Sequence, residues 1–173
     1  MNTKKVWLVT GASKGLGLSL VKKLLNEGYQ VAATSRTVES LEKEVGTSAN
    51  FLPLEVNVTD ETNVSKAIAK TIETFGGIDV VVNNAGYGQL GTLEELSDRE
   101  ARQNFDANVF GLLNVMRNVM PHLRNKKIRT HYQHFFHSRI FGCISGLGNL
   151  QRDKICCCRF DRSVFGRSNI AGN

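Results

Sequence analysis

One glycine-rich turn organises the chain: it reads Thr10-Gly11-Ala12-Ser13-Lys14-Gly15-Leu16-Gly17. Before it, Val6-Trp7-Leu8-Val9 forms an apolar run typical of a buried parallel strand, and after it leucines recur at helical spacing. A plain strand-to-helix turn often contains one glycine, whereas this turn has three in the spacing GxxxGxG. The pattern predicts a strand, a phosphate-binding turn and a helix that starts inside the motif.

Each glycine has its own expected role in this turn. Gly11 can adopt backbone angles closed to other residues, Gly15 lets the main chain approach a pyrophosphate, and Gly17 lets the helix lie close to the strand. Free amides and the positive end of the helix dipole favour an anion. The residues of this turn that we expect to bind a cofactor are Gly11, Ser13, Lys14, Gly15, Leu16 and Gly17.

Strand-like and helix-like segments alternate along the first part of the chain. Expected strands cover residues 4–10, 30–35, 51–56 and 78–83, and expected helices cover residues 15–27, 38–45 and 60–75. This alternation predicts an α/β fold, with a Rossmann-like doubly wound parallel sheet and helices on both faces. The sheet is expected to be incomplete, because only four strands are clear from the sequence.

A further helix is expected to begin at Ser97, which has Glu100 in the capping-box position. Pro121 falls near the expected end of this helix. Apolar residues at helical spacing predict its buried face, which comprises Phe105, Val109, Leu112, Leu113 and Met116.

The character of the sequence changes after Lys127. Residues 1–127 carry 15 Lys and Arg against 14 Asp and Glu, whereas residues 128–173 carry 7 against 2. The second segment also contains all four cysteines and three of the four histidines, and no period holds in it. We therefore expect a Rossmann-like nucleotide-binding region at 1–127 and an irregular basic tail at 128–173. Neither contains an apolar run long enough for a signal peptide or a membrane span, so a cytoplasmic protein is expected.

The end of the second expected strand, Ser35-Arg36, indicates which dinucleotide is bound. Such sites usually place an acidic residue here to bind the ribose 2'-hydroxyl, and that residue would repel a 2'-phosphate. Arg36 can instead bind a 2'-phosphate, and Lys14 can add a second cation. We therefore expect NADP(H) rather than NAD(H), with Ser35 and Arg36 in the site. Either cation alone would be read as an ordinary surface charge.

Two further polar segments follow expected strands at the edge where parallel sheets bind ligands. Asn57, beside Val58, could hydrogen-bond an adenine edge, or it could belong to a turn that leads into a helix capped by Thr59 or Asp60. The fourth strand ends in Asn83-Asn84-Ala85-Gly86, where small residues leave room for a ribose. Besides Asn57 and Val58, the expected cofactor-binding residues here are Asn84, Ala85 and Gly86.

Together with Asn108-Val109-Phe110-Gly111, these motifs resemble the short-chain dehydrogenase/reductase family over residues 4 to about 127. The resemblance implies hydride transfer between NADP(H) and a small-molecule carbonyl or alcohol substrate. It implies that Asn108 supports a water and a catalytic lysine, although Asn108 could equally be a polar position on a packed helix. It also makes an oligomer possible.

The family's chemistry further uses a serine after the fifth strand and a Tyr-x-x-x-Lys pair on the next helix. None of Tyr29, Tyr87 and Tyr132 is followed by a lysine four residues later. By this resemblance, the family's catalytic serine, tyrosine and lysine are absent in this reading frame. The chain is therefore expected to be inactive.

A change of reading frame would explain the tail. Residues 128–136 can be encoded by ATC CGG ACA CAT TAT CAA CAT TTC TTC, which reads S-G-H-I-I-N-I-S-S after a shift of one base. Residues 148–156 can be encoded by GGC AAT TTA CAG CGC GAC AAA ATT TGC, which in the same frame reads A-I-Y-S-A-T-K-F. Both missing motifs reappear in order. We hypothesise that one extra A at Lys126-Lys127, present through mutation or through sequencing error, shifted the frame of a reductase gene.

Other functions are compatible with the sequence. The chain could be a non-catalytic nucleotide-binding fragment. Its basic tail could bind nucleic acid or an anionic membrane, but the charges form no stripe and neither partner is expected. Cys143 and Cys156-Cys157-Cys158 could bind a metal with the tail histidines, but they lack paired C-x-x-C spacing and no metal is expected.

Overall fold

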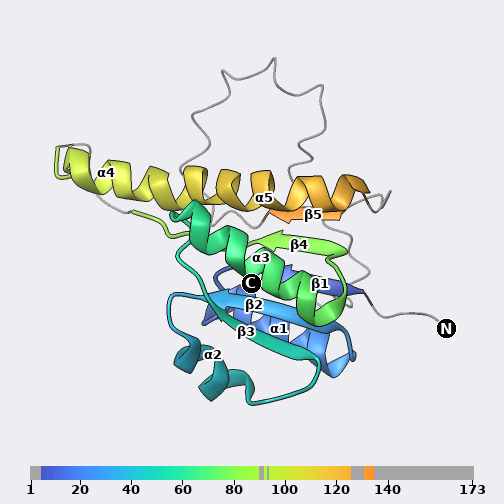
Figure 1. The fold of residues 1–173 in the computed structure, drawn as a ribbon. Coiled ribbons are helices and arrows are strands. Elements are labelled where there is room, and N and C mark those ends of the chain that lie inside the picture. The colour runs from blue at the N-terminus through green and yellow to red at the C-terminus, as the bar shows by residue number, and fades with distance from the viewer. Residues whose placement is uncertain (1–4, 90–91, 93, 126–130, 135–173) are drawn as a thin grey trace, which may run out of the picture.

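The computed structural model describes residues 5–89, 92, 94–125 and 131–134 (Figure 1). Helices and strands alternate in the order that the sequence predicts. The elements are β1 (Val6–Val9), α1 (Gly15–Asn26), β2 (Gln30–Ser35), α2 (Val38–Val45), β3 (Phe51–Glu55), α3 (Glu61–Phe75), β4 (Val80–Asn83), α4 (Asp98–Phe105), the π-helix η1 (Asp106–Phe110), α5 (Gly111–Asn125) and β5 (His131–His134).

The strands form one parallel sheet in the order β3-β2-β1-β4-β5. The chain moves outward from β1 to β3, then returns to pair β4 with the other side of β1. This reversal confirms the predicted doubly wound, Rossmann-like α/β fold. In such sheets the ligand crevice lies beyond the carboxyl ends of the strands, where the strand order reverses. That point lies here between β1 and β4.

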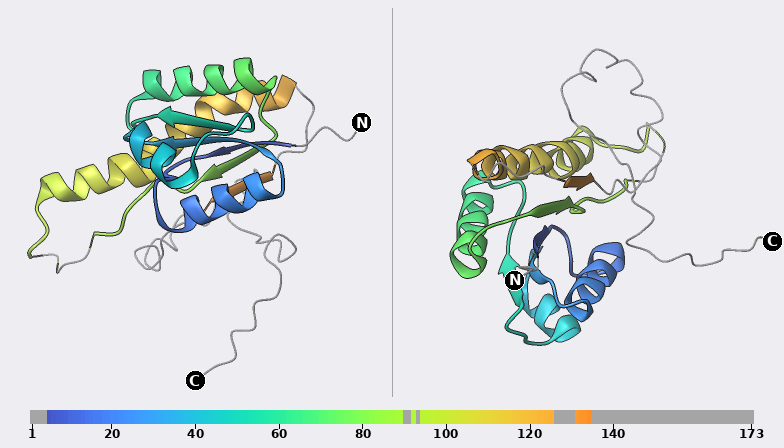
Figure 2. Two further views of the ribbon diagram at one scale, coloured as in Figure 1. Left: turned by 90° about the horizontal axis from the view of Figure 1, so that it is seen from below. Right: turned by 90° about the vertical axis from the view of Figure 1, so that its right-hand side faces the viewer.

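Helices cover both faces of the sheet: α1 and α2 lie on one side, and α3 and α5 on the other (Figure 2). Trp7 and Val9 pack in the first layer with α1, whereas Leu8, between them in the sequence, packs in the second with α3 and α5. Because successive side chains of a strand point to opposite faces, β1 is apolar at every position. All four of its residues are buried.

Three strands are shorter than predicted. The first, expected at 4–10, covers Val6–Val9, and Met1 to Lys4 lie outside the described residues. The third, expected at 51–56, ends at Glu55. The fourth, expected at 78–83, begins at Val80; at its start the Val6 N–H donates to the Asp79 carboxylate at 2.7 Å instead of to a main-chain carbonyl. Apolar runs identify these strands but do not fix their ends.

The prediction of an irregular tail was wrong for residues 131–134, which form β5 and pair in parallel with β4. The sequence His-Tyr-Gln-His has no apolar alternation that would reveal a strand. Strand pairing is made by main-chain groups, so the open edge of β4 can accept a segment that lacks the pattern. Residues 135–173, including all four cysteines, lie outside the described residues.

The single helix expected after Ser97 is three consecutive helical segments, and its predicted buried face was partly wrong. Phe105 is 49% exposed and Leu113 is 40% exposed. Beyond Gly111, the buried apolar residues are Val115, Val119 and Leu123. Two features account for this difference. The helix α4 extends beyond the ends of the strands (Figure 1), so it has no sheet to cover, and the wider π-helical turn η1 interrupts the regular helical period.

Among the described residues, no helix combines the length and apolar character needed to cross a membrane. Within the same residues, no group of three or more His, Cys, Asp or Glu side chains could hold a metal ion.

The predicted capping box at the start of α4 is confirmed, and it generates a pH-dependent prediction. Hydrogen bonds from the Ser97 side chain and backbone lower the pKa of the exposed Glu100 carboxyl. A lowered folded-state pKa means that the cap stabilises α4 above the ordinary pKa of glutamate and loses this contribution as the pH falls through the lowered value. Ser97→Ala should raise the Glu100 pKa toward its ordinary value, as measured by NMR titration.

Thr74→Ala is the matched control, because the Thr74 hydroxyl bonds to the Lys70 carbonyl inside α3 and caps no helix. It should leave the Glu100 titration unchanged. An unchanged titration in Ser97→Ala would show that the capping box does not set this pKa.

Candidate cofactor site

The glycine-rich turn is joined to the end of β4 by partly buried hydrogen bonds. The Thr10 hydroxyl oxygen, in a residue only 3% exposed, accepts from the backbone N–H groups of Asn84 at 3.1 Å and Ala85 at 3.0 Å. In return, Asn84 Nδ2 donates to the carbonyls of Thr10 at 3.1 Å and Gly11 at 2.8 Å. The loops that follow β1 and β4 are therefore joined by four hydrogen bonds. Thr10 was not among the predicted site residues.

Gly11 and Gly17 are required by close contacts between these loops. Gly11 has a φ of +65°, and a Cβ there would lie 2.6 Å from Ala85 Cα. A Cβ on Gly17 would lie 2.5 Å from Asn84 Nδ2 and 2.6 Å from the Gly11 carbonyl oxygen. By contrast, Gly15 has a φ of +59° and nothing within 4 Å of its ideal Cβ position. Its main chain is open to a bound group.

The start of α1 is suited to an anion. Its N-cap residue, Lys14, makes no side-chain capping hydrogen bond, and the first turn contains no acidic residue. The first amides of a helix have no partner within the helix, and the helix dipole is positive at this end. Ser13 is half-buried in the same turn. Leu16, an expected cofactor-binding residue, is 55% exposed at the rim of the turn, whereas Gly17 makes the close contacts with Asn84 and Gly11.

At the end of β2, no carboxylate occupies the position where an NAD-type site would place one. Ser35 is buried, and its hydroxyl lies 3.2 Å from that of Ser40 and accepts from the Thr37 amide at 3.4 Å. Arg36 follows it and is exposed. Within residues 5–89, 92 and 94–125, neither Arg36 nor Lys14 makes an ion pair or side-chain hydrogen bond.

Past the end of β3, Asn57 forms the turn that leads into α3. Its side-chain oxygen accepts from the Thr59 amide at 3.2 Å and from the Thr59 hydroxyl at 2.9 Å. Asp60 is the N-cap of α3 and accepts from the Asn63 amide. The structural alternative for Asn57 is thus correct. It does not exclude the other, because the turn uses only the oxygen of the amide and leaves Nδ2 as a donor.

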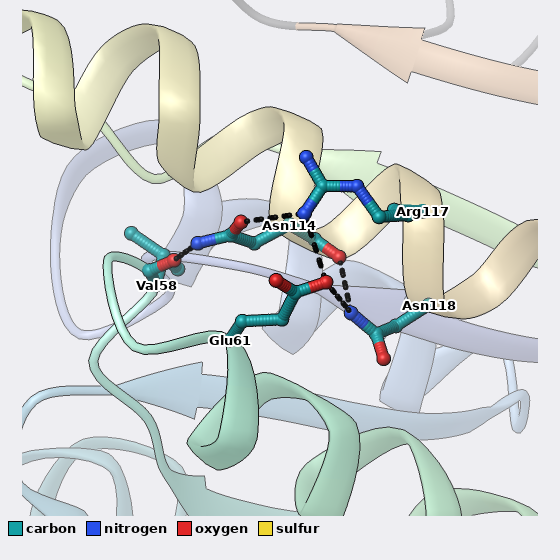
Figure 3. A network of polar contacts seen from close by, with 5 residues as sticks. All are labelled: Val58, Glu61, Asn114, Arg117 and Asn118. Atoms are coloured by element: carbon teal, nitrogen blue, oxygen red, sulfur yellow. Dashed lines mark hydrogen bonds and ion pairs between the residues drawn. The ribbon is translucent and has the colours of Figure 1, made fainter.

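This turn is held in place by α5, through the network in Figure 3. Asn114 Nδ2 donates to the Val58 carbonyl at 3.0 Å, and Arg117 pairs with Glu61 at 2.8 Å. Asn118 Nδ2 also donates to Glu61, at 3.2 Å. A Cβ on Gly111 would lie 2.8 Å from Val58 Cγ2, so the close approach of helix and turn needs glycine. Sequence reasoning missed Asn114, although its spacing from Asn118 places both on one helix face.

Asn108 is bound to the loop after β4. Its side-chain oxygen accepts from the Tyr87 amide at 2.9 Å, and its Nδ2 donates to the Tyr87 carbonyl at 2.8 Å and to the side-chain oxygen of Asn104 at 3.0 Å. A Cβ on Gly86 would lie 2.6 Å from Asn108 Oδ1. Sequence reasoning did not find Asn104, although the i, i+4 spacing of two asparagines was a usable signal.

A family model described as short chain dehydrogenase matches residues 5–129. This match covers the first four strands of the sheet, the glycine-rich turn and Asn108, and it ends before β5. The chain belongs to the short-chain dehydrogenase family.

Individual relatives agree with this assignment. The chain is 38% identical over 125 residues to "Oxidoreductase BOA17" from Botryotinia fuckeliana (strain B05.10), covering 71% of this chain and 46% of that protein. It is similar to a short-chain dehydrogenase structure from Streptomyces avermitilis, with a TM-score of 0.72, 32% identity and coverage of 78% of this chain and 49% of the other. The chain therefore spans about half the length of the relatives it matches.

Two similar structures contain a dinucleotide. "ElxO with NADP Bound" has a TM-score of 0.69 and 29% identity, and covers 76% of this chain and 54% of its own. A 3-ketoacyl-(acyl-carrier-protein) reductase from Brucella melitensis complexed with NADH has a TM-score of 0.70 and 24% identity, and covers 75% of this chain and 56% of its own. The second likeness concerns the fold alone.

Two of the three tyrosines can be placed by their surroundings. Tyr29 packs edge-on against Trp7, with ring centroids 5.9 Å apart, in the layer covered by α1. Tyr87 is 44% exposed, and it is its main chain that Asn108 binds. In the sequence, the residues four positions after Tyr29 and Tyr87 are alanine and glycine, so neither tyrosine belongs to a Tyr-x-x-x-Lys pair.

The glycine contacts yield a stability prediction. Gly17→Ala introduces a Cβ that overlaps Asn84 Nδ2 and the Gly11 carbonyl, neither of which can move without breaking the bond between them. We expect the free energy of unfolding in urea to fall by about 1–3 kcal/mol, as for other overpacked sites.

Gly88→Ala is the matched control, because its ideal Cβ position has nothing within 4 Å and no positive φ is recorded there. Equal stability loss in the two variants would argue against the close approach at Gly17.

Proposed function

We propose that this chain binds NADP(H) and derives from a reductase or dehydrogenase that transfers hydride between NADP(H) and a small-molecule carbonyl or alcohol. The observation that carries the cofactor preference is the pair of exposed cations, Lys14 and Arg36, with no described partner and no carboxylate at the end of β2. A 2'-phosphate would provide the missing counter-charge, since Arg is suited to paired charged hydrogen bonds with phosphate.

The geometry of the turn fits the rest of a dinucleotide. Gly15 leaves the main chain open beside an uncapped helix start, which suits a pyrophosphate. Asn57 has a donor nitrogen left for an adenine edge. Small residues at Ala85 and Gly86 leave space beside β4. In this proposal the remaining contacts come from Ser13, Leu16, Gly17, Ser35, Val58 and Asn84.

When bound, the dinucleotide would supply the hydride chemistry. The residues of this chain can hold and orient it, but they include no Tyr-x-x-x-Lys pair to move the proton that a carbonyl or alcohol needs. We therefore propose that the chain as given binds the cofactor without turnover. A shifted frame after Lys127 remains our explanation for the missing groups. For a relative with the complete reading frame, we also propose a cytoplasmic location and the formation of an oligomer.

The cofactor preference is tested with Arg36→Ala. Loss of a charged hydrogen-bonding partner should raise the Kd for NADPH by about 10-fold to 100-fold, whereas the Kd for NADH should change by less than about 3-fold. Fluorescence titration of reduced cofactor measures both constants.

Arg102→Ala is the control for charge, because Arg102 pairs with Asp98 on α4, away from the end of β2. It should leave both constants unchanged. Equal weakening of NADPH and NADH in Arg36→Ala would contradict a 2'-phosphate contact, and no binding of either cofactor to the parent chain would overturn the proposed function.

The frame hypothesis is tested in the gene. Genomic DNA and transcript should be sequenced across the codons for Lys126 to Arg129. Seven A bases followed by TCC would mean that the shifted product is genuine, and six would mean that the extra base is a sequencing error. Deletion of one A should give a product that oxidises NADPH with a carbonyl substrate, whereas the chain as given should not. A nucleotide sequence that does not encode the serine and Tyr-x-x-x-Lys in the shifted frame would disprove the hypothesis.

A further inference from the structure

We infer that Asn104 is a positioning residue for the nicotinamide half of the cofactor site, acting through Asn108 and the Tyr87 backbone. This inference rests on the proposed function. Asn104 is the last but one residue of α4, and Asn108 lies four residues later in η1. Neither the glycine-rich turn nor the predicted site includes Asn104.

Two side-chain amides converge on one carbonyl in this cluster. The Tyr87 carbonyl oxygen accepts from Asn104 Nδ2 at 2.9 Å and from Asn108 Nδ2 at 2.8 Å. The Tyr87 amide donates to Asn108 Oδ1 at 2.9 Å. Both main-chain groups of Tyr87 are therefore held, and they lie on the loop directly after Gly86.

Asn104 also fixes which way the Asn108 amide faces. Asn108 Nδ2 donates its second hydrogen to Asn104 Oδ1 at 3.0 Å. If the Asn108 amide were reversed, its oxygen would face the oxygens of Tyr87 and Asn104, and its nitrogen would face the Tyr87 N–H. Without Asn104, one of the three bonds that oppose this reversal is lost, and the Tyr87 carbonyl keeps a single donor.

The position of this cluster in the sheet assigns it to the nicotinamide half. In a doubly wound fold, the strand group with the ribose-binding residue at its second strand holds the adenosine, and the other group holds the second nucleotide. Arg36 follows β2, in the first group, whereas Tyr87 follows β4, on the opposite side of β1. A change in the Tyr87 loop should therefore affect only the nicotinamide half of the ligand.

The test compares NADPH with 2',5'-ADP, which has the adenosine and phosphate groups but no nicotinamide. In Asn104→Ala we expect the Kd for NADPH to rise about 3-fold to 10-fold, in line with the loss of one or two neutral hydrogen bonds, and the Kd for 2',5'-ADP to stay within about 2-fold. Asn104→Asp keeps an acceptor for Asn108 Nδ2 and loses only the donor to the Tyr87 carbonyl, so the Kd for NADPH should again rise while the Kd for 2',5'-ADP stays within about 2-fold.

Gln103→Ala is the matched control: it removes an exposed amide from the adjacent position of α4, and no described hydrogen bond involves that side chain. It should change neither constant. Hydrogen exchange of the Tyr87 amide gives a readout without cofactor, and it should be faster in Asn104→Ala than in Gln103→Ala.

Equal weakening of both ligands in Asn104→Ala would mean a general structural role and would overturn the inference, as would unchanged NADPH binding or unchanged exchange of the Tyr87 amide. If the parent chain binds neither ligand, the proposed function itself fails. If the parent chain binds both ligands and Asn104→Ala binds them with unchanged Kd values, only the inference on Asn104 fails.

Discussion

The candidate site depends on the partly buried hydrogen bonds between Thr10 and Asn84. These residues follow adjacent strands on the two sides of the strand-order reversal, and each binds main-chain groups of the other's loop. Thr10 is almost fully buried, so its bonds are shielded from water, and an unpaired partner would cost more there than at the surface. The same contact requires glycine at position 17, since any Cβ would displace Asn84. The hydrogen bonds between Thr10 and Asn84 therefore determine both the close packing at Gly17 and the shape of the candidate site.

The helices after the fourth strand extend this constraint to the other strand ends. Asn108 in η1 binds the loop after β4, and Asn114 in α5 binds the turn after β3. Both contacts need a glycine opposite or beside the asparagine, at Gly86 and Gly111 respectively. One continuous helical segment therefore fixes two of the loops that would surround a dinucleotide, and Glu61 ties the same segment to α3 through Arg117.

Most of the fold could be predicted because its signals are local. The apolar strands, the helical spacing and the GxxxGxG turn each depend on residues close in sequence, and the sheet order then follows from the rules for parallel crossovers. β5 could not be predicted in this way, since its pairing uses main-chain groups and its sequence has no apolar period. The exposure of Phe105 also required the structure, because it depends on where α4 passes the sheet edge.

The site was predictable to a similar depth. The glycines and Asn84 were identified from their positions at strand ends. Thr10, Asn104 and Asn114 were not. The i, i+4 spacing of the asparagines can place them on one helix face, but it does not reveal the distant main-chain groups that they bind. The partner of Asn114 is 56 residues away in sequence, at Val58. Such contacts become visible only after the strands have been placed side by side.

The distribution of these contacts explains how binding can be separated from chemistry in this chain. Every residue proposed to touch the dinucleotide lies between Gly11 and Gly86, on loops fixed by bonds among the described residues. The two faces of β4 beneath these loops are also covered. Val81 is fully buried in the layer of α3 and α5, and Val82 is fully buried in the layer of α1. The proton-transfer groups of the family belong to segments after the fifth strand. A change of frame after Lys127 would remove those groups while leaving intact the hydrogen bonds that shape the cofactor site, so loss of turnover need not entail loss of binding.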